Sequence, residues 1–127
     1  MKIENIKFKA KRLDNSEWVE GYFYAECGNA YIIKDRQKHS MLNRNEAVLV
    51  DPSTVCQFTG LKDCDGTDIF EGDLLAEKRF PMYEVGYIDG EFVASYIGEN
   101  AFIFKLYALS NDCVVCGSKY DRKGGEK

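Results

Sequence analysis

The chain has 127 residues, 45% of them hydrophobic, which is enough to build one core or two small ones without metals or disulfides. Its 17 basic and 21 acidic residues give a net charge of −4, which argues against a dedicated duplex-DNA-binding protein. The sequence shows no apolar run of membrane-spanning length and no secretory leader, so we expect a cytoplasmic protein of a bacterial host with reduced thiols.

The first part of the chain predicts a β lobe over residues 1–56. Ile6 and Phe8 alternate with lysines, and an aromatic segment follows at 17–26, so a turn at 14–16 should join two strands as a hairpin. A turn at 27–29 leads into a strand at 30–34, a polar loop at 35–46 and a strand at 47–50. Asp51 before Pro52 predicts one helical turn within 51–55.

The second part predicts short strands at 55–60, 68–70, 73–79, 83–88, 91–97, 101–109 and 112–117, then a mobile tail at 119–127. Asp65-Gly66 and Asp89-Gly90 are hairpin-turn signals, because glycine supplies the positive φ that the turn needs. The pattern predicts an all-β fold with very little helix. We expect a small SH3-type barrel or roll at 57–118 after the N-terminal β-hairpin lobe, both within one domain spanning 1–127.

Residues 57–75 are the most informative block. Thr59-Gly60 should end a strand, residues 63–66 should make a hairpin, and Gly72-Asp73 should bend the chain into the next strand. This block closely resembles the signature of the YopX family, small proteins encoded by phages and prophages. The matching residues are Gln57, Phe58, Thr59, Gly60, Leu61, Asp63, Gly66, Ile69, Phe70, Glu71, Gly72 and Asp73. The similarity extends over nearly the whole chain and weakens at 116–121.

The resemblance implies a mainly β fold with SH3-type character and a phage or prophage origin, and it implies no particular biochemical activity. We interpret its polar and glycine positions as turn formers rather than a binding site: Gln57, Thr59, Gly60, Asp63, Gly66, Glu71, Gly72 and Asp73. A calcium loop centred on Gly66 fails, because Leu61 and Gly72 would occupy ligand positions.

Cys113 and Cys116 have the spacing of half a zinc site or of a thiol-disulfide motif. A structural zinc would need two further ligands, and the remaining cysteines and His39 lie scattered along the chain. In a strand, positions 113 and 116 point to opposite faces, so we expect ordinary thiols and no bound metal. A metal-dependent or redox protein using these thiols, or the acidic block 63–73, is kept as the alternative.

The N-terminal hairpin carries the chain's best nucleic-acid surface, formed by Lys7, Lys9, Lys11, Arg12 and Trp18. The neighbouring rings of Tyr22, Phe23, Tyr24 and Tyr31 are expected to divide between the two faces of the sheet, with about half in the core. Residues 1–50 hold nine basic and seven acidic side chains (+2), and residues 51–127 hold eight and fourteen (−6). This excess of acidic charge predicts weak single-strand binding at most.

No catalytic constellation is visible, since the single histidine lies in a charged loop. The sequence therefore favours a non-enzymatic β-barrel accessory protein without a cofactor, which contacts a protein or a nucleic acid partner. Self-association is also expected, because small barrels have exposed strand edges and the second half is rich in aromatic residues.

Overall fold

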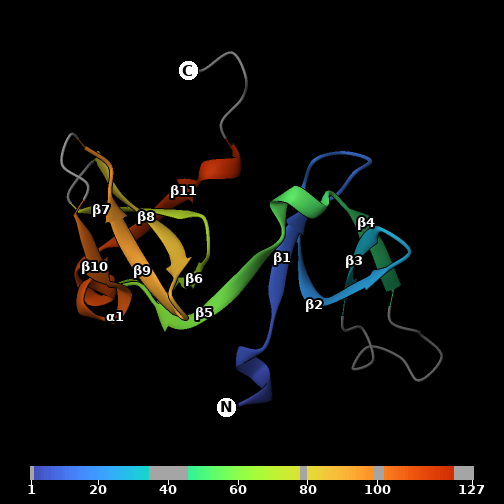
Figure 1. The fold of residues 1–127 in the computed structure, drawn as a ribbon, viewed down its shortest axis with the longest axis horizontal. Helices are drawn as coiled ribbons and strands as arrows, with labels where there is room; N and C mark the ends of the chain where they lie inside the picture. The colour runs from blue at the N-terminus through green and yellow to red at the C-terminus, as the bar shows by residue number, and fades with distance from the viewer. Residues whose placement is uncertain (1, 35–45, 78–79, 99–101, 122–127) are drawn as a thin grey trace. The chain divides into compact units, whose positions relative to one another are not determined.

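The computed structural model describes residues 2–34, 46–77, 80–98 and 102–121. The predicted polar loop at 35–46 therefore lies almost wholly outside the described residues, as does the end of the tail from 122 onward. The chain forms two compact units, Met1–Gln57 and Phe58–Lys127 (Figure 1). Strand accounts for 59% of the structure and helix for 16%, which confirms the all-β class.

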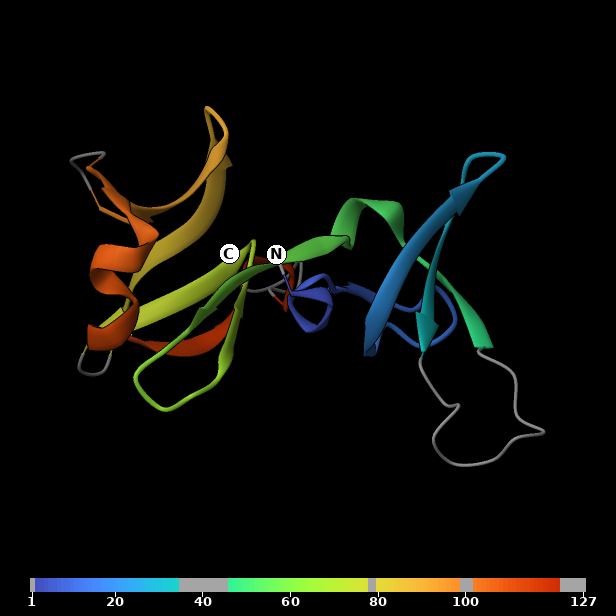
Figure 2. The ribbon, with the colours of Figure 1, turned by 90° about the horizontal axis from the view of Figure 1, so that it is seen from below.

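The N-terminal unit contains β1 (Phe8–Lys11), β2 (Trp18–Glu26), β3 (Asn29–Lys34) and β4 (Glu46–Val50). They form an antiparallel sheet in the order β4-β3-β2-β1, with the start of β5 (Cys56–Lys62) added beside β1. The hairpin of β2 and β3 is drawn in blue to cyan in Figure 2, and the neighbouring strand β4 is drawn in green. The predicted hairpin around residues 14–16 is confirmed, since Ala10 faces Val19 in the register of β1 and β2.

This sheet curls on itself. Asp51 N–H donates to the Lys11 carbonyl at 2.8 Å, and Leu13 N–H donates to the Leu49 carbonyl at 3.2 Å. These bonds and a bridge between Arg12 and Val50 join the end of β1 to the end of β4. The inside of the curl is a small core formed by Ala10, Val19, Ala30, Ile32, Val48 and Val50.

A 3-10 turn, η3 (Pro52–Thr54), connects β4 to β5 and confirms the helical turn predicted there. The Asp51 carboxylate accepts from Ser53 N–H at 3.0 Å, so it caps the turn as its position before proline suggested.

The C-terminal unit holds the rest of β5, with β6 (Asp68–Phe70), β7 (Asp73–Glu77), β8 (Phe80–Ile88), β9 (Glu91–Tyr96), β10 (Ile103–Lys105) and β11 (Val114–Ser118). Strand β5 pairs with β6, and the other five form an antiparallel sheet in the order β10-β9-β8-β7-β11. The core consists of Ile69, Leu75, Tyr83, Val85, Ala94, Leu106 and Cys113. Within the described ranges the sheets have open edges, so the expected SH3-type barrel is not closed.

Three local expectations are corrected. The segment 101–109 is not one strand: β10 ends at Lys105, and the helix α1 (Leu106–Leu109) follows, because leucines three residues apart on one helical turn can both reach the core. Strand β5 does not stop at Thr59-Gly60, since Gly60, at φ +87°, lets it continue through an irregular register to Lys62. The tail begins with an ordered 3-10 turn, η5 (Lys119–Asp121).

No helix among the described residues combines the length and the apolar character needed to cross a membrane.

Candidate functional site on the outer face of the N-terminal sheet

The signature block 57–73 lies around a turn between β5 and β6, and three of its polar side chains, those of Thr59, Asp63 and Asp73, bond to the protein's own backbone. Asp63 is the clearest case. Its carboxylate accepts from Asp65 N–H at 2.8 Å, Thr67 N–H at 2.9 Å and Val115 N–H at 2.8 Å. One side chain thus closes the turn and also holds β11, which is 52 residues away in the sequence.

The protonation of Asp63 fits this role. Burial alone would raise its pKa, but the backbone N–H donors of Val115, Thr67, Asp65 and Gly66 outweigh it and hold the pKa below the usual value of 3.8. The side chain is only 5% exposed, so its charge is satisfied by backbone amides rather than by water.

Three other signature residues also bond to the backbone. Buried Asp73 accepts from Phe70 N–H at 2.8 Å, and the Thr59 hydroxyl donates to the Ile69 carbonyl at 2.7 Å. Gly72, at φ +89°, donates its N–H to the Val85 carbonyl at 2.8 Å and accepts from Lys119 N–H at 2.9 Å. Gly66, at φ +84°, occupies the hairpin turn as predicted. For Thr59, Asp63, Gly66, Gly72 and Asp73, these contacts and backbone angles give a structural role at each position.

The acidic block does not converge on a point. Among the residues that the structure describes, no group of three or more His, Cys, Asp or Glu side chains is placed to hold a metal ion. Instead Asp68 forms an ion pair with Lys62, while Asp63 and Asp73 bond to backbone amides.

Cys113 and Cys116 lie in different surroundings, since Cys113 just precedes β11 and Cys116 lies within it. Cys113 is buried in the C-terminal core, whereas Cys116 is exposed at a register shift of β11, where its thiol lies 3.4 Å from the Leu74 carbonyl. Burial raises the pKa of both thiols, with Glu77 adding to the effect at Cys113. Reactive thiols require the opposite shift, so this arrangement gives no support to the redox alternative.

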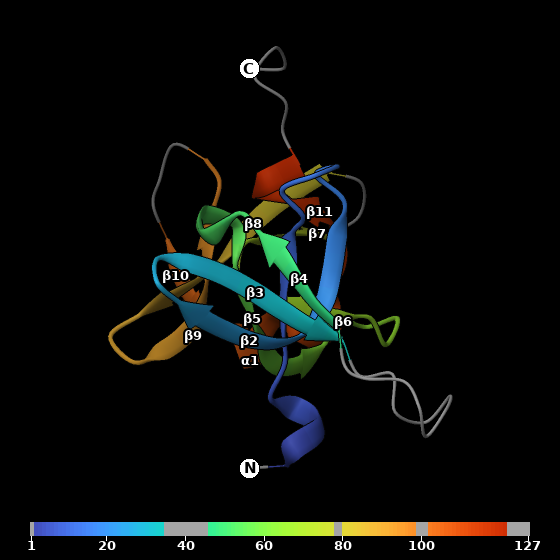
Figure 3. The ribbon, with the colours of Figure 1, turned by 90° about the vertical axis from the view of Figure 1, so that its right-hand side faces the viewer.

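The N-terminal sheet presents a different kind of surface, which we call the outer face. Residues opposite one another in a register share a face, so the pairs Lys11–Trp18, Lys9–Glu20, Tyr22–Ile33 and Tyr24–Tyr31 all lie on the side away from the small core. Leu49 of β4 extends the row beyond Tyr31. The outer face consists of Lys9, Lys11, Trp18, Glu20, Tyr22, Tyr24, Glu26, Asn29, Tyr31, Ile33, Ala47 and Leu49; Figure 3 shows β2, β3 and β4 running side by side.

Two of its four aromatic side chains are exposed on a hydrogen-bonded sheet, while Trp18 and Tyr31 are half-buried. Tyr22 is 41% exposed and Tyr24 is 43% exposed, and the rings of Tyr24 and Tyr31 lie 5.8 Å apart. The Glu26 carboxylate accepts a hydrogen bond from the Tyr24 hydroxyl, which raises the pKa of Tyr24 and fixes the phenol. The expectation that about half of these rings would enter the core is wrong, since Phe23, on the inner side beside Phe8, is also 41% exposed.

Positive charge lies at one end of this face. The ammonium of Lys9 lies 4.6 Å from the centre of the Trp18 ring and that of Lys11 lies 5.4 Å from it. The structure therefore brings together three of the five residues predicted as a nucleic-acid surface. The indole is half-buried and carries the two ammonium groups over its ring, so this end of the face supplies charge for an anion.

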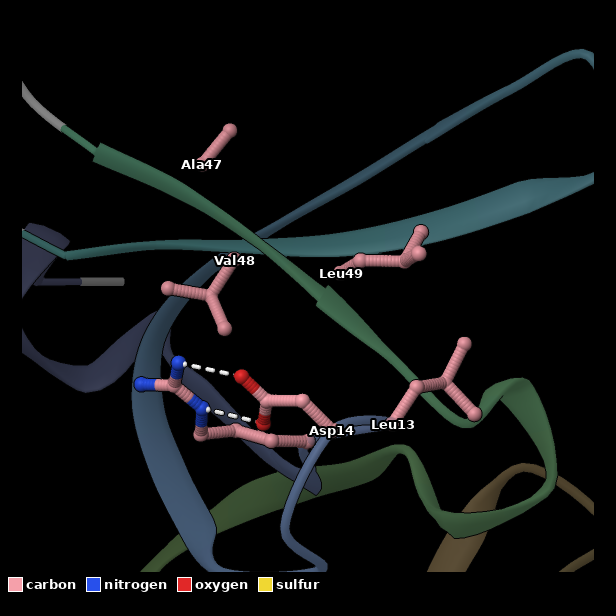
Figure 4. Close-up of a pocket in the computed structure, with 6 residues that line it drawn as sticks. Leu13, Asp14, Ala47, Val48 and Leu49 are labelled. Atoms are coloured by element: carbon pink, nitrogen blue, oxygen red, sulfur yellow. Dashed lines mark hydrogen bonds and ion pairs between the residues drawn. The ribbon is translucent and has the colours of Figure 1, made fainter.

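The other two predicted residues lie elsewhere. Arg12 forms a two-pronged ion pair with Asp14, at 2.9 and 2.8 Å, and helps line a hollow of about 410 Å³ beside β4 (Figure 4). Lys7 precedes β1 and lines a second hollow, of about 530 Å³, together with Ile3, Ile6 and Tyr22.

One residue behind this surface was missed by sequence reasoning. Gly21 lies where β2 changes partner, since its pairing with β1 ends there and its pairing with β3 begins at Tyr22. A Cβ on Gly21 would lie only 2.3 Å from the Ile33 carbonyl oxygen, so this close approach requires glycine. The sequence did hold a signal for this close approach, namely a glycine inside a segment that is otherwise rich in aromatic residues.

Comparison with known families finds that the model described as YopX protein matches residues 1–123. A search of curated proteins finds no match to the chain.

Proposed function

Because the chain belongs to the YopX family, and three side chains of the family's signature form hydrogen bonds with the protein's own backbone, we propose that it is a non-enzymatic binding module whose contact surface is the outer face. The observation that carries the proposal is the exposure of Tyr22 and Tyr24 above 40% on a rigid, paired sheet. Tyrosine and tryptophan supply large contact area at low entropic cost, and contiguous exposed patches mark interaction sites.

The proposed biological setting is an accessory protein of phage or prophage origin that acts in the bacterial cytoplasm. Membership of the YopX family supports this setting. The genes that flank the gene for this chain provide a direct test. Neighbours devoted to replication, packaging or host takeover would indicate the process that the module serves, whereas an ordinary chromosomal setting would contradict the proposed origin.

Site-specific photo-crosslinking tests the binding surface. A benzophenone side chain placed at position 24 in the full chain should give one discrete adduct in cells that carry the native gene. The matched control is position 107, because Tyr107 is 67% exposed but belongs to the C-terminal unit. An excess of the unlabelled wild-type chain should suppress this adduct, whereas an excess of the Tyr22→Ala/Tyr24→Ala variant should not. Equal adducts from both positions, or none from position 24, would contradict the proposal.

A second contact is proposed for β10, as the site of self-association. This strand is at the edge of the C-terminal sheet, and Phe102, Ile103 and Phe104 are exposed between 40% and 55%. Apolar edge strands readily pair with a second chain. We expect a concentration-dependent dimer in sedimentation at tens of micromolar, which Ile103→Lys converts to monomer. A monomer at every concentration would refute self-association.

A further inference from the structure

We infer that the partner of the outer face is single-stranded nucleic acid, bound without sequence preference by stacking of its bases on the rings of β2. This inference rests on the proposed function, because it names the partner of the same surface. It combines three observations: the exposed rings of Tyr22 and Tyr24, a pair of cations at one end of β2, and a spacing between the two rings that suits successive bases.

The spacing follows from strand geometry. Positions 18, 20, 22 and 24 share the outer side of β2, so Tyr22 and Tyr24 are separated by about 6.7 Å, whereas Trp18 lies about 13 Å from Tyr22 with Glu20 between them. Tyr31 lies beside Tyr24 on the next strand, at 5.8 Å between ring centres, and widens the platform there. Every base has a π-face, so such a platform tolerates any sequence.

The charge is placed where a sugar-phosphate backbone would pass. A strand whose bases stack on Tyr22 and Tyr24 can extend its phosphates towards the ammonium groups of Lys9 and Lys11, which lie over the half-buried Trp18 ring at 4.6 and 5.4 Å from its centre. A double helix keeps its bases stacked on one another and offers these rings no face. The surface therefore discriminates in favour of single strands by geometry, while two cations supply only modest affinity.

One residue makes the inference unusually easy to test. Glu20 lies on the same face, opposite Lys9 and between Trp18 and Tyr22 along β2. Its carboxylate faces the path proposed for the phosphates and repels them. Removing this charge should therefore tighten binding to a nucleic acid, although most surface substitutions in a binding site weaken it.

The experiment is a fluorescence anisotropy titration of labelled oligo(dT) and oligo(rU), each of about fifteen nucleotides, with the full-length chain. With two phosphate contacts on a single strand, a plot of the logarithm of the affinity against the logarithm of the salt concentration should have a slope of about −1.4. The affinity should therefore fall roughly fifteen-fold when the salt concentration rises from ~20 to ~150 mM. Tyr22→Ala/Tyr24→Ala should weaken binding about ten-fold or more without changing the slope.

The charge variants then separate the contributions. Lys9→Gln/Lys11→Gln should flatten the salt slope towards zero, whereas Lys9→Arg/Lys11→Arg should keep it. Glu20→Gln should tighten binding about two- to three-fold. Tyr107→Ala is the matched control and should change nothing, and thermal melts establish that each variant is folded. DNA and RNA binding equally well indicates stacking alone, and a preference for either identifies the natural strand.

No change in anisotropy up to ~500 µM protein at low salt, or binding that Glu20→Gln weakens, would overturn the inference. The photo-crosslinking experiment separates this failure from that of the proposed function. An adduct at position 24 that protease removes and nuclease spares would leave the binding surface standing with a protein partner. An adduct of twice the chain mass would identify a second copy as the partner.

Discussion

Both units expose aromatic side chains, but they differ in what forms their cores and in how their acidic side chains are used. In the C-terminal unit, Tyr83 is buried and Phe58 packs on Phe70 at 5.5 Å, while the carboxylates of Asp63 and Asp73 bond to backbone amides. In the N-terminal unit, the tyrosines of β2 face outward and the core is made of small aliphatic residues. The family signature thus marks where the fold is held together, whereas the exposed aromatic face lies outside that block.

The largest test of this contrast is Asp63→Ala. The substitution leaves three backbone donors, at 65, 67 and 115, without their acceptor. We expect the free energy of unfolding to fall by about 3 kcal/mol, as measured by urea denaturation. The matched control is Asp65→Ala in the same turn, where the side chain is exposed and a change within about 0.5 kcal/mol is expected. Equal losses for the two variants would show that Asp63 is not the residue that holds the turn.

Lowering the pH should remove the stabilisation that the Asp63 carboxylate provides. Because the pKa of Asp63 is lower in the folded chain than the usual 3.8, its stabilising effect is complete above that value and is lost as pH falls through the lower, folded pKa. The difference in unfolding free energy between wild type and Asp63→Asn should therefore be constant above about pH 5 and should shrink below about pH 3.8. A difference that widens on acidification would reverse the sign of the linkage.

Gly21→Ala tests the N-terminal unit. The new Cβ would approach the Ile33 carbonyl oxygen to 2.3 Å, so β2 and β3 must separate, and we expect a loss of about 2 kcal/mol. Gly86→Ala in β8 is the control, because nothing lies within 4 Å of the added methyl and the backbone is not left-handed. That variant should be neutral or slightly stabilising in thermal melts. A harmless Gly21→Ala would mean that β2 does not pack as described.

Gly66→Ala should have a smaller effect. The position has open space around it but a φ of +84°, so the loss of about 1 kcal/mol arises from backbone strain alone. Gly66→Asn should recover part of the loss, since asparagine tolerates this conformation better than alanine. If alanine and asparagine melt alike and no lower than the parent, then the turn is not left-handed at this residue.

The smallest expected signal is binding to duplex DNA. The net charge is −4, and few cations gather on the outer face, so no tight complex should form at physiological salt. Submicromolar affinity for any duplex in an anisotropy titration at ~150 mM salt would contradict this.

Sequence reasoning predicted most of the strands, the left-handed glycines at 66 and 72, and the family, because turn chemistry and alternation are local signals. It failed where the outcome depends on packing between distant segments. Alternation predicted two faces for β2, but only the rest of the fold decides whether a second layer covers either face. For the same reason, the helical turn at Leu106 and the bond from Asp63 to Val115 were not readable from local pattern.

If the outer face makes the contacts while the signature block supports the fold, the two regions should respond differently to a ligand. An amide NMR titration of the 15N-labelled full chain with single-stranded oligo(dT) at low salt measures both responses at once. Chemical-shift changes should concentrate at residues 9–11, 18–24 and 31–33 and leave residues 63–67 unchanged. Changes centred on the turn at 63–67 or on the C-terminal sheet would contradict this expectation.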